Sequence, residues 1–516
     1  MTKSTLRGSF LPCLLATAMF ASCGGGGGGG APVRAVNAFV DVTKDAGLDL
    51  EPPLGTPTGN GIGATCGDYD ADGDIDIYVL RGKRPAVLFR NRGDGRFDEV
   101  AANAGVAVVG NYCGPSFADV DGDGFLDLFV CGVVDARPKL FRNRGDGTFE
   151  DITASSGLQL SGETCAAAWG DYDRDGDLDL FITRWERQNL TRPTNEHLWR
   201  NNGDLTFTDV SDASLISRTI RQSTQGDLTF TPNFADIDND GWPDLLIAAD
   251  FKTSRIYRNQ RDGTFADVTT SVINEDNGMG AAVGDYDNDG DLDWFVSSIW
   301  HKDPTNGWTG NRLYRNRGDG TFEDATDEAG VREGDWGWGA SFADFDQDGH
   351  LDLMHVNGWF HDGFEVDRSR LWLANGDGSF RETAEQLGFS DRGQGRALMV
   401  FDADGDGDLD FFVDNLDNAW KLYRNDLDKG GYLQVRLKGS APNTEAIGAR
   451  VYLSVGATTL MREIQCGCNF LAQNPAEAHF GLGGAQVIDE LRIVWPDGAQ
   501  TVRTQVAVNQ KLVIAR

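Results

Sequence analysis

Residues 68–76 read Asp-Tyr-Asp-Ala-Asp-Gly-Asp-Ile-Asp, an alternation of aspartates interrupted by one glycine. Carboxylate oxygens at alternate positions suit a hard cation such as calcium, and glycine at the sixth position permits a sharp turn. We call this pattern, Asp-x-Asp-x-Asp-Gly-x-x-Asp, a ladder, and we predict that each copy binds one calcium ion, up to seven in all. The seven copies begin at Asp68, Asp119, Asp171, Asp236, Asp285, Asp344 and Asp402.

In each ladder we expect ligands at positions one, three, five, seven and nine. Positions one, three, five and nine would use side chains, whereas position seven would use its backbone carbonyl, because the residue there varies among Asp, Phe, Trp and His. The expected ligands are Asp68, Asp70, Asp72, Asp74, Asp76, Asp119, Asp121, Asp123, Phe125, Asp127, Asp171, Asp173, Asp175, Asp177, Asp179, Asp236, Asp238, Asp240, Trp242, Asp244, Asp285, Asp287, Asp289, Asp291, Asp293, Asp344, Asp346, Asp348, His350, Asp352, Asp402, Asp404, Asp406, Asp408 and Asp410.

The ladder differs from an EF-hand, which needs a glutamate at position twelve and a helix on each side. Position twelve is Val79 in the first copy and Val130 in the second. The ladders run directly into apolar, strand-like segments such as 126–130. A single copy would fit a solvated acidic turn, but seven copies favour a calcium loop within a β-hairpin.

The chain is strongly acidic, with a formal net charge of −34. Four aspartate side chains in each of seven ladders account for 28 of the 80 acidic residues, so much of this charge is metal-ligand chemistry. A surface of this sign is unsuited to nucleic acid, and cations, basic proteins or neutral glycans are the expected partners.

The N-terminus carries an export signal. Lys3 and Arg7 precede an apolar stretch at 10–20, and Ala-Ser-Cys23 is followed by seven glycines at 24–30. Small residues before a cysteine resemble a bacterial lipobox, which predicts lipidation of Cys23; cleavage nearby or a noncleaved anchor are the alternatives. We therefore expect an exported lipoprotein of a bacterial outer membrane or cell surface, with signal 1–23 and a glycine-rich linker 24–37. No later segment is apolar enough to span a bilayer, so the lipid is the expected membrane contact.

Two cysteines occupy equivalent places in neighbouring repeats. Cys113 and Cys165 each lie six residues before a ladder. The oxidising compartment would permit a disulfide between them, and two small buried thiols are the alternative.

Two further motifs recur between ladders. A Leu-aromatic-Arg-Asn segment precedes an Asp-Gly turn, which is typical of a second hairpin. A Phe-x-Asp-Val-Thr tail follows the first six ladders, and the seventh copy stands at the N-terminus, at 39–43. The first segment should therefore complete the last repeat and remove an open sheet edge. We predict an all-β chain with a seven-bladed β-propeller at 38–426 and a small β-rich domain at 427–516.

The ladders and hairpins resemble the FG-GAP/VCBS repeats of integrin-α-like propellers. The segments 432–437, 446–451, 479–483 and 494–498 resemble an ASPIC/UnbV domain, so the whole order is similar to the cartilage acidic protein 1 family. Two places depart from the usual pattern, namely Pro442-Asn443-Thr444 and Asn474-Pro475. The resemblance implies calcium binding and extracellular interaction, with no chemistry to carry over.

For function, we expect a binding or adhesion module for a glycan or an extracellular protein, and no enzyme. The chain has no His-Glu-x-x-His and no Gly-x-Ser-x-Gly, and His479 beside an aromatic residue is typical of a packed side chain. The Arg-Gly-Asp triplets, such as 92–94, lie in the repeated hairpin, where the turn itself requires Asp-Gly. A calcium-dependent polysaccharide lyase or hydrolase, or a structural part of an envelope assembly, are the alternatives.

Irregular insertions in the longer repeats are candidates for a binding face. They contain Trp and Arg, which are frequent in binding sites, although packing between blades would explain the tryptophans equally well. The insertions are 184–196, 211–226, 300–310 and 359–369.

Overall fold

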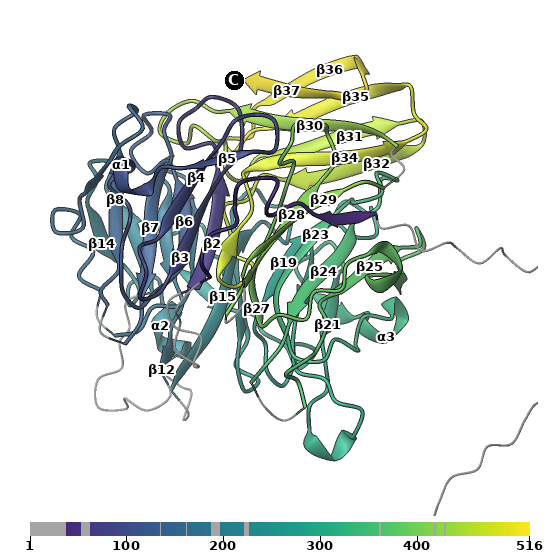
Figure 1. Ribbon diagram of the computed structural model, residues 1–516, viewed down its shortest axis with the longest axis horizontal. Helices are drawn as coiled ribbons and strands as arrows, with labels where there is room; N and C mark the ends of the chain where they lie inside the picture. The colour runs from purple at the N-terminus through teal and green to yellow at the C-terminus, as the bar shows by residue number, and fades with distance from the viewer. Residues whose placement is uncertain are drawn as a thin grey trace, which may run out of the picture.

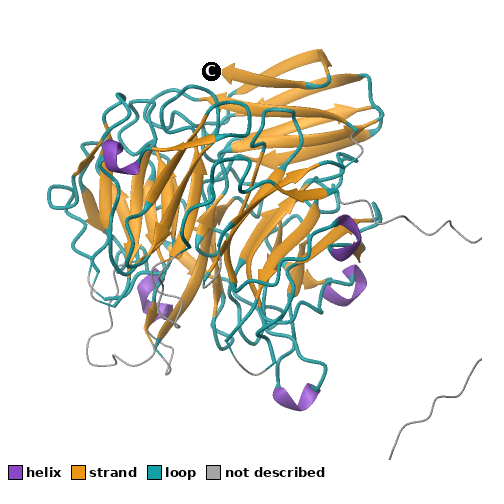
Figure 2. Ribbon diagram, viewed as in Figure 1, coloured by secondary structure: helices purple, strands orange, loops and turns teal. Residues whose placement is uncertain are grey.

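The computed structural model describes residues 38–516 apart from 53–61, 135, 161, 187–196, 221–225, 361–362, 417–418 and 428–429. The signal segment and Cys23 lie outside these residues. The described chain is built mainly of β-strands (Figures 1 and 2), which confirms the all-β class. None of its helices is both long and apolar enough to cross a membrane.

Each of the seven repeats forms one antiparallel sheet in which successive strands are neighbours, and each ladder lies between the first and second strands. The first three sheets are β2–β5 (Ile62–Gly67, Asp76–Arg81, Val87–Asn91, Phe97–Glu99), β6–β9 (Tyr112–Ala118, Asp127–Gly132, Lys139–Asn143, Phe149–Asp151) and β10, β11, β13, β14 (Ala167–Gly170, Asp179–Ile182, Leu198–Asn201, Phe207–Asp209). The next three are β15–β18 (Asp227–Ala235, Asp244–Ala249, Arg255–Asn259, Phe265–Asp267), β19–β22 (Ala281–Gly284, Asp293–Val296, Arg312–Asn316, Phe322–Asp324) and β23–β26 (Gly337–Ala343, Asp352–Asn357, Arg370–Ala374, Phe380–Glu382).

The seventh sheet joins the two ends of the repeat region. Strands β27 (Gly395–Phe401), β28 (Asp410–Asn415) and β29 (Lys421–Asn425) are completed by β1 (Phe39–Asp41), with Phe39 opposite Asn425. The N-terminal strand exchange expected from the tail motif is therefore present.

The first strands of the sheets touch in cyclic order. They run β2, β6, β10, β15, β19, β23, β27 and back to β2 around a central channel. These strands read as nearly continuous buried runs, because one face meets the preceding sheet and the other meets the following sheet. Short helices lie in the connections, namely α1 (Ala101–Ala104), α2 (Ile216–Ile220), α3 (Thr326–Ala329) and the 3₁₀ turns η1 (Pro304–Asn306) and η2 (Glu385–Leu387).

The C-terminal part packs over the propeller (yellow in Figure 1) and contains two sheets. One has the order β34-β30-β37 and the other β32-β31-β35-β36. Their bounds are β30 Gly431–Lys438, β31 Arg450–Val455, β32 Thr458–Glu463, β34 Glu477–Gly483, β35 Val487–Val494, β36 Gln500–Ala507 and β37 Gln510–Ala515.

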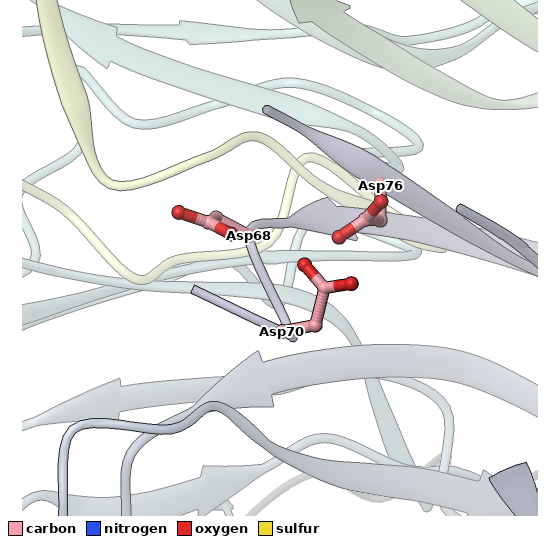
Figure 3. Close-up of side chains that lie close together, drawn as sticks. All are labelled: Asp68, Asp70 and Asp76. Carbon is pink, nitrogen blue, oxygen red and sulfur yellow. The ribbon is translucent and has the colours of Figure 1, made fainter. Parts of the chain in front are cut away.

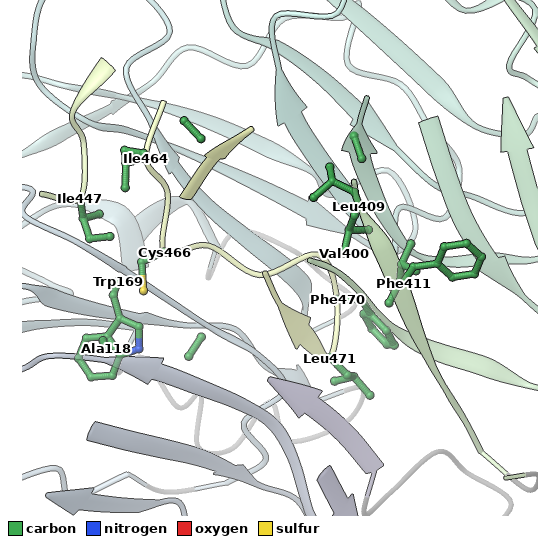
Figure 4. Close-up of a cluster of buried hydrophobic side chains, with 14 of the residues drawn as sticks. Ala118, Trp169, Val400, Leu409, Phe411, Ile447, Ile464, Cys466, Phe470 and Leu471 are labelled. Atoms are coloured by element: carbon green, nitrogen blue, oxygen red, sulfur yellow. The ribbon is translucent and has the colours of Figure 1, made fainter. Parts of the chain in front are cut away.

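The segment 464–474 leaves these sheets and enters the central channel (Figure 4). Within it, β33 (Ala472–Gln473) pairs in parallel with β2. The Trp169 backbone N–H donates to Cys466 O at 2.9 Å, and the Asn469 amide donates to Leu398 O at 2.6 Å. The sequence predicted a separate small β domain, and the structure shows that this domain also fills the propeller channel.

Candidate functional site

The ladders share one turn conformation. The glycine at position six has a positive φ in all seven copies, from 83° at Gly241 to 105° at Gly73. Its N–H donates to the first aspartate of the ladder, as Gly73 does to Asp68 at 3.1 Å. The N–H of the residue at position seven donates to the aspartate at position five, as Asp74 does to Asp72 at 3.0 Å. The loop therefore wraps around its own carboxylates.

The aspartate at position nine of each ladder also has a structural role that the sequence did not reveal. Both oxygens of Asp76 accept backbone N–H groups, from Tyr69 at 3.2 Å and from Asn91 at 2.8 Å. The equivalent pair of bonds occurs in the other six repeats. This aspartate is almost fully buried in every repeat. It joins the ladder to the third strand of its sheet.

The donor set fits a divalent cation. Asp68, Asp70 and Asp76 each place a carboxylate oxygen within 4.8 Å of the others (Figure 3), and so do the groups Asp119, Asp121, Asp127; Asp171, Asp173, Asp179; Asp236, Asp238, Asp240; and Asp285, Asp287, Asp289. Burial raises the pKa of Asp76 to about 9 and that of Asp171 to about 7. A bound cation would favour the charged carboxylates and reverse this shift.

Orphaned oxygens point to the same conclusion. A buried carboxylate without a partner is costly, and a metal ion would satisfy it. In the described part of the chain, one oxygen has no hydrogen-bond partner in each of Asp68, Asp70, Asp171, Asp285, Asp287 and Asp346. The carboxylates that these groups bring together therefore fit a divalent cation such as calcium.

Basic and polar side chains of the C-terminal domain contact the first aspartates of four ladders. Arg436 lies 2.5 Å from Asp68, and Lys511 lies 2.8 Å from Asp402. The remaining contacts are Arg450 with Asp236 at 3.5 Å and the Thr444 hydroxyl with Asp119. The domain therefore covers the ends of the inner strands that carry the ladders.

A cavity of about 420 Å³ lies at the opposite ends of the inner strands, where the first strands begin and the second strands end. Its walls include five tryptophans with Phe230, Met279 and Arg396, and Phe470 reaches it from the channel segment. Three of the tryptophans come from the predicted insertions, and two lie at the start of β23. The five are Trp185, Trp308, Trp336, Trp338 and Trp359.

The indoles form a packed group. Trp336 and Trp359 stack with ring centroids 4.9 Å apart and planes 17° from parallel, and Trp338 stacks beside Trp336 at 6.5 Å. Trp185 stacks on Phe230 at 6.1 Å. Residues 334–339 show no periodic pattern of apolar residues, so the sequence did not predict this wall of the cavity. The run Trp336-Gly-Trp338 was the feature of the sequence that could have indicated it.

The structure agrees with some of the other sequence predictions and differs from others. Of the insertion 211–226, the described residues 211–220 and 226 do not line the cavity, and neither does Trp300. Cys113 and Cys165 are free thiols in this structure; Cys113 is buried, with its Sγ 3.2 Å from Thr164 O, whereas Cys165 is partly exposed. The His479 ring is 9% exposed, its Nε2 lies 3.0 Å from Gly407 O, and it is packed as expected.

The family follows from the repeats. Residues 68–130, 127–182, 190–247, 236–296, 303–355 and 363–413 match the FG-GAP-like repeat, and residues 439–516 match the ASPIC and UnbV domain. The chain belongs to the FG-GAP-like repeat family, and its fold is a β-propeller with an ASPIC and UnbV domain.

The chain is related over most of its length to cartilage acidic protein 1. The mouse protein is 25% identical over 87% of this chain and 72% of its own length, and the human protein is 25% identical over 87% and 70%. Among solved structures, an Agrocybe aegerita lectin described as recognising terminal N-acetylglucosamine has a TM-score of 0.43 at 21% identity, covering 70% of this chain and 94% of the lectin. A rhamnogalacturonan lyase has a TM-score of 0.39 at 14% identity, covering 76% of each chain.

Proposed function

We propose that this chain is an exported calcium-binding β-propeller that acts as a binding or adhesion module for a glycan or an extracellular protein. In this proposal the ladders bind calcium as structural ions, because their carboxylates are turned into the hairpin loops and are partly covered by the C-terminal domain. Lipidated Cys23 and the glycine-rich linker would hold the module at a bacterial outer membrane or cell surface.

The observation that carries the proposal is the tryptophan-lined cavity. Its volume of about 420 Å³ falls in the range of small-molecule sites, which are mostly apolar with a few polar groups. Trp185, Trp308 and Trp359 stand on three different insertions and still meet in one place. Partly exposed indoles gathered in this way are typical of binding sites.

A retention experiment tests the proposal. The calcium-loaded mature protein is immobilised and incubated with neutral and acidic polysaccharides and with extracellular proteins of the source cell, and a chelated sample serves as control. We expect retention of a glycan or protein without shortening of the glycan. Release of short products would instead favour a calcium-dependent lyase or hydrolase, and an absence of both retention and products would contradict the binding function.

A further inference from the structure

Resting on the proposed calcium-binding function, we infer that Arg142 and Arg261 make the second and fourth ladders weak calcium sites. Each guanidinium pairs with aspartates that the ion would use as ligands, so it supplies part of the positive charge that calcium supplies elsewhere. These two ladders therefore fill last, at a higher calcium concentration than the others.

In the second ladder, Arg142 bridges the aspartates at positions three and five. Its Nε lies 2.6 Å from Asp121 Oδ2, and its Nη2 lies 3.1 Å from Asp123 Oδ2. The other oxygens of these carboxylates accept the backbone N–H groups of Asp123 at 3.3 Å and of Phe125 at 3.1 Å. The aspartates at positions one and nine are also hydrogen-bonded through both oxygens. Every carboxylate oxygen of this ladder therefore already has a partner.

The fourth ladder carries two arginines at the same two positions. Arg261 Nε donates to Asp240 Oδ2 at 2.9 Å, and Arg258 Nε lies 3.1 Å from Asp238 Oδ2. Directly opposite Arg258 on the neighbouring strand is Ala266, which offers no carboxylate in place of Asp238. Charge-assisted hydrogen bonds of this kind are strong, and a calcium ion must either displace the guanidinium or bind beside a like charge.

The place of Arg261 in its hairpin directs its side chain towards the ladder. A Cβ atom at the equivalent residue of the first repeat, Gly93, would lie 2.6 Å from a carboxylate oxygen of Asp74, and one at Gly318 would lie 2.7 Å from Asp291. An arginine at this place is therefore next to the ligands. Five other repeats have glycine there, namely Gly93, Gly145, Gly203, Gly318 and Gly376.

The fifth ladder provides the contrast. Arg315 occupies the place of Arg142 in its Leu-aromatic-Arg-Asn motif, but its Nε donates to Glu323 on the neighbouring strand at 2.7 Å. One oxygen of Asp285 and one of Asp287 have no hydrogen-bond partner among the described residues. These oxygens are left for a bound ion, so the fifth ladder belongs to the tight sites.

The charge of the ladders leads to the same order. Position seven is Asp291 in the fifth ladder but Phe125 in the second and Trp242 in the fourth. Four aspartates and one arginine give the second ladder a formal charge of −3, four aspartates and two arginines give the fourth −2, and five aspartates give the fifth −5. Calcium affinity depends on the number of charged ligands, so the second and fourth ladders attract the ion less.

The test is a calcium titration of the mature protein after chelation, in which native mass spectrometry counts the ions and calorimetry gives their dissociation constants. Arg142→Gln removes the first guanidinium. Arg261→Gly removes the second and restores the residue of the other hairpins, which suits the φ of 62° at this position. Arg315→Gln is the matched control, because Arg315 belongs to the same motif as Arg142 but pairs with Glu323.

We expect two of the ions to bind about tenfold or more weakly than the others. Arg142→Gln and Arg261→Gly should each tighten one of these two by about tenfold, the double variant should tighten both, and Arg315→Gln should change none. Arg261 lies in a turn with its side chain 55% exposed, so Arg261→Gly keeps the test valid if Arg142→Gln unfolds.

Equal affinity for all the ions in the wild type would overturn the inference, and so would unchanged binding in both arginine variants. Weaker calcium binding in these variants would also overturn it, because the arginines would then orient the ligands for the ion. Each of these results leaves the proposed calcium binding standing. A protein that takes up no calcium would contradict both the inference and the proposed function.

Discussion

The Asn91 side chain donates a hydrogen bond of 2.9 Å to the backbone carbonyl of Ala403, the second residue of the seventh ladder. Asn91 is the last residue of the Leu-aromatic-Arg-Asn motif in the first repeat, so this bond connects the first repeat to the ladder of the last. Its second bond, to Ile75 O at 3.1 Å, reaches the ladder of its own repeat.

The same link recurs around the channel. The motif asparagine of a repeat donates to the second ladder residue of the preceding repeat, at 2.7 to 2.9 Å, in the pairs Asn143–Tyr69, Asn201–Val120, Asn259–Tyr172, Asn316–Ile237 and Asn425–Phe345. The sixth repeat has Ala374 at this place and lacks the link. The asparagine of the Leu-aromatic-Arg-Asn motif therefore joins the ladders of neighbouring repeats.

Removing one such link should weaken the whole propeller. Asn259→Ala leaves the buried carbonyls of Tyr172 and Pro243 without their donor, so we expect a loss of about 2 to 3 kcal/mol in the free energy of unfolding. Chemical denaturation in excess calcium measures this loss in the free energy of unfolding. Asn375→Ala, at an exposed position with one surface hydrogen bond, is the control; an equal loss in both variants would refute the role of the link.

One ladder can be disabled on its own. The double substitution Asp287→Ala with Asp289→Ala removes two of the expected ligands of the fifth ladder. We expect one calcium ion fewer per chain and a melting temperature lower by roughly 3 °C or more in calcium, because bound metal stabilises the folded state. Asp262→Asn, in an exposed turn of the second hairpin, is the control. An unchanged ion count and an unchanged melt would reject the ladder as a calcium site.

Docking of the C-terminal domain depends on Arg436. This side chain bridges Asp68 of the first ladder and Glu477 of β34, at 2.5 Å to each. Arg436→Gln should lower the free energy of unfolding by about 2 kcal/mol, since it removes the guanidinium that pairs with two partly buried carboxylates. Protease cleavage between 426 and 431, followed over time, should speed up in this variant. Arg503→Gln, on the exposed strand β36, should leave both the stability and the cleavage rate as in the wild type.

We expect the free energy of unfolding at acid pH to depend on the protonation of His355. Burial, and to a smaller extent the nearby Arg370, lower the pKa of His355 to about 3. The unfolded chain takes up the proton near pH 6.5 and the folded chain does not, so stability is complete above about pH 6.5 and falls as the pH approaches 3. The loss attributable to His355 at pH 5 is about 2 kcal/mol.

Urea unfolding at pH 7 and pH 5 in excess calcium measures this loss. His355→Gln should lose about 2 kcal/mol less than the wild type between the two pH values, whatever its stability at pH 7. His301→Gln, in a partly exposed loop, should lose as much as the wild type. Identical pH dependence in wild type and His355→Gln would contradict the burial argument.

The repeats could be predicted from the sequence because the same short motifs recur in each copy. The glycine of the ladder, the Asp-Gly turn and the displaced tail at 39–43 predicted the hairpins and the exchange of β1. The turn geometry of Gly73 and the pairing of Phe39 with Asn425 follow directly from these patterns.

The channel segment and the cavity could not be read in this way. Segment 464–474 gains its partners only when the ring is closed, since Trp169, Ala340 and Leu398 come from three different repeats. Trp336 and Trp359 likewise meet through the fold and not through spacing. The sequence predicts the aspartate at position nine as a ligand, but its two backbone hydrogen bonds could not be predicted, because they depend on the register of the third strand.

The most direct test of the central claim is native mass spectrometry of the mature protein, first stripped by chelation and then titrated with calcium. We predict successive addition of calcium ions up to seven per chain, accompanied by a rise in melting temperature, and no comparable effect from equal magnesium. A protein that takes up no calcium, or whose melting temperature does not change as calcium is added, would contradict the account.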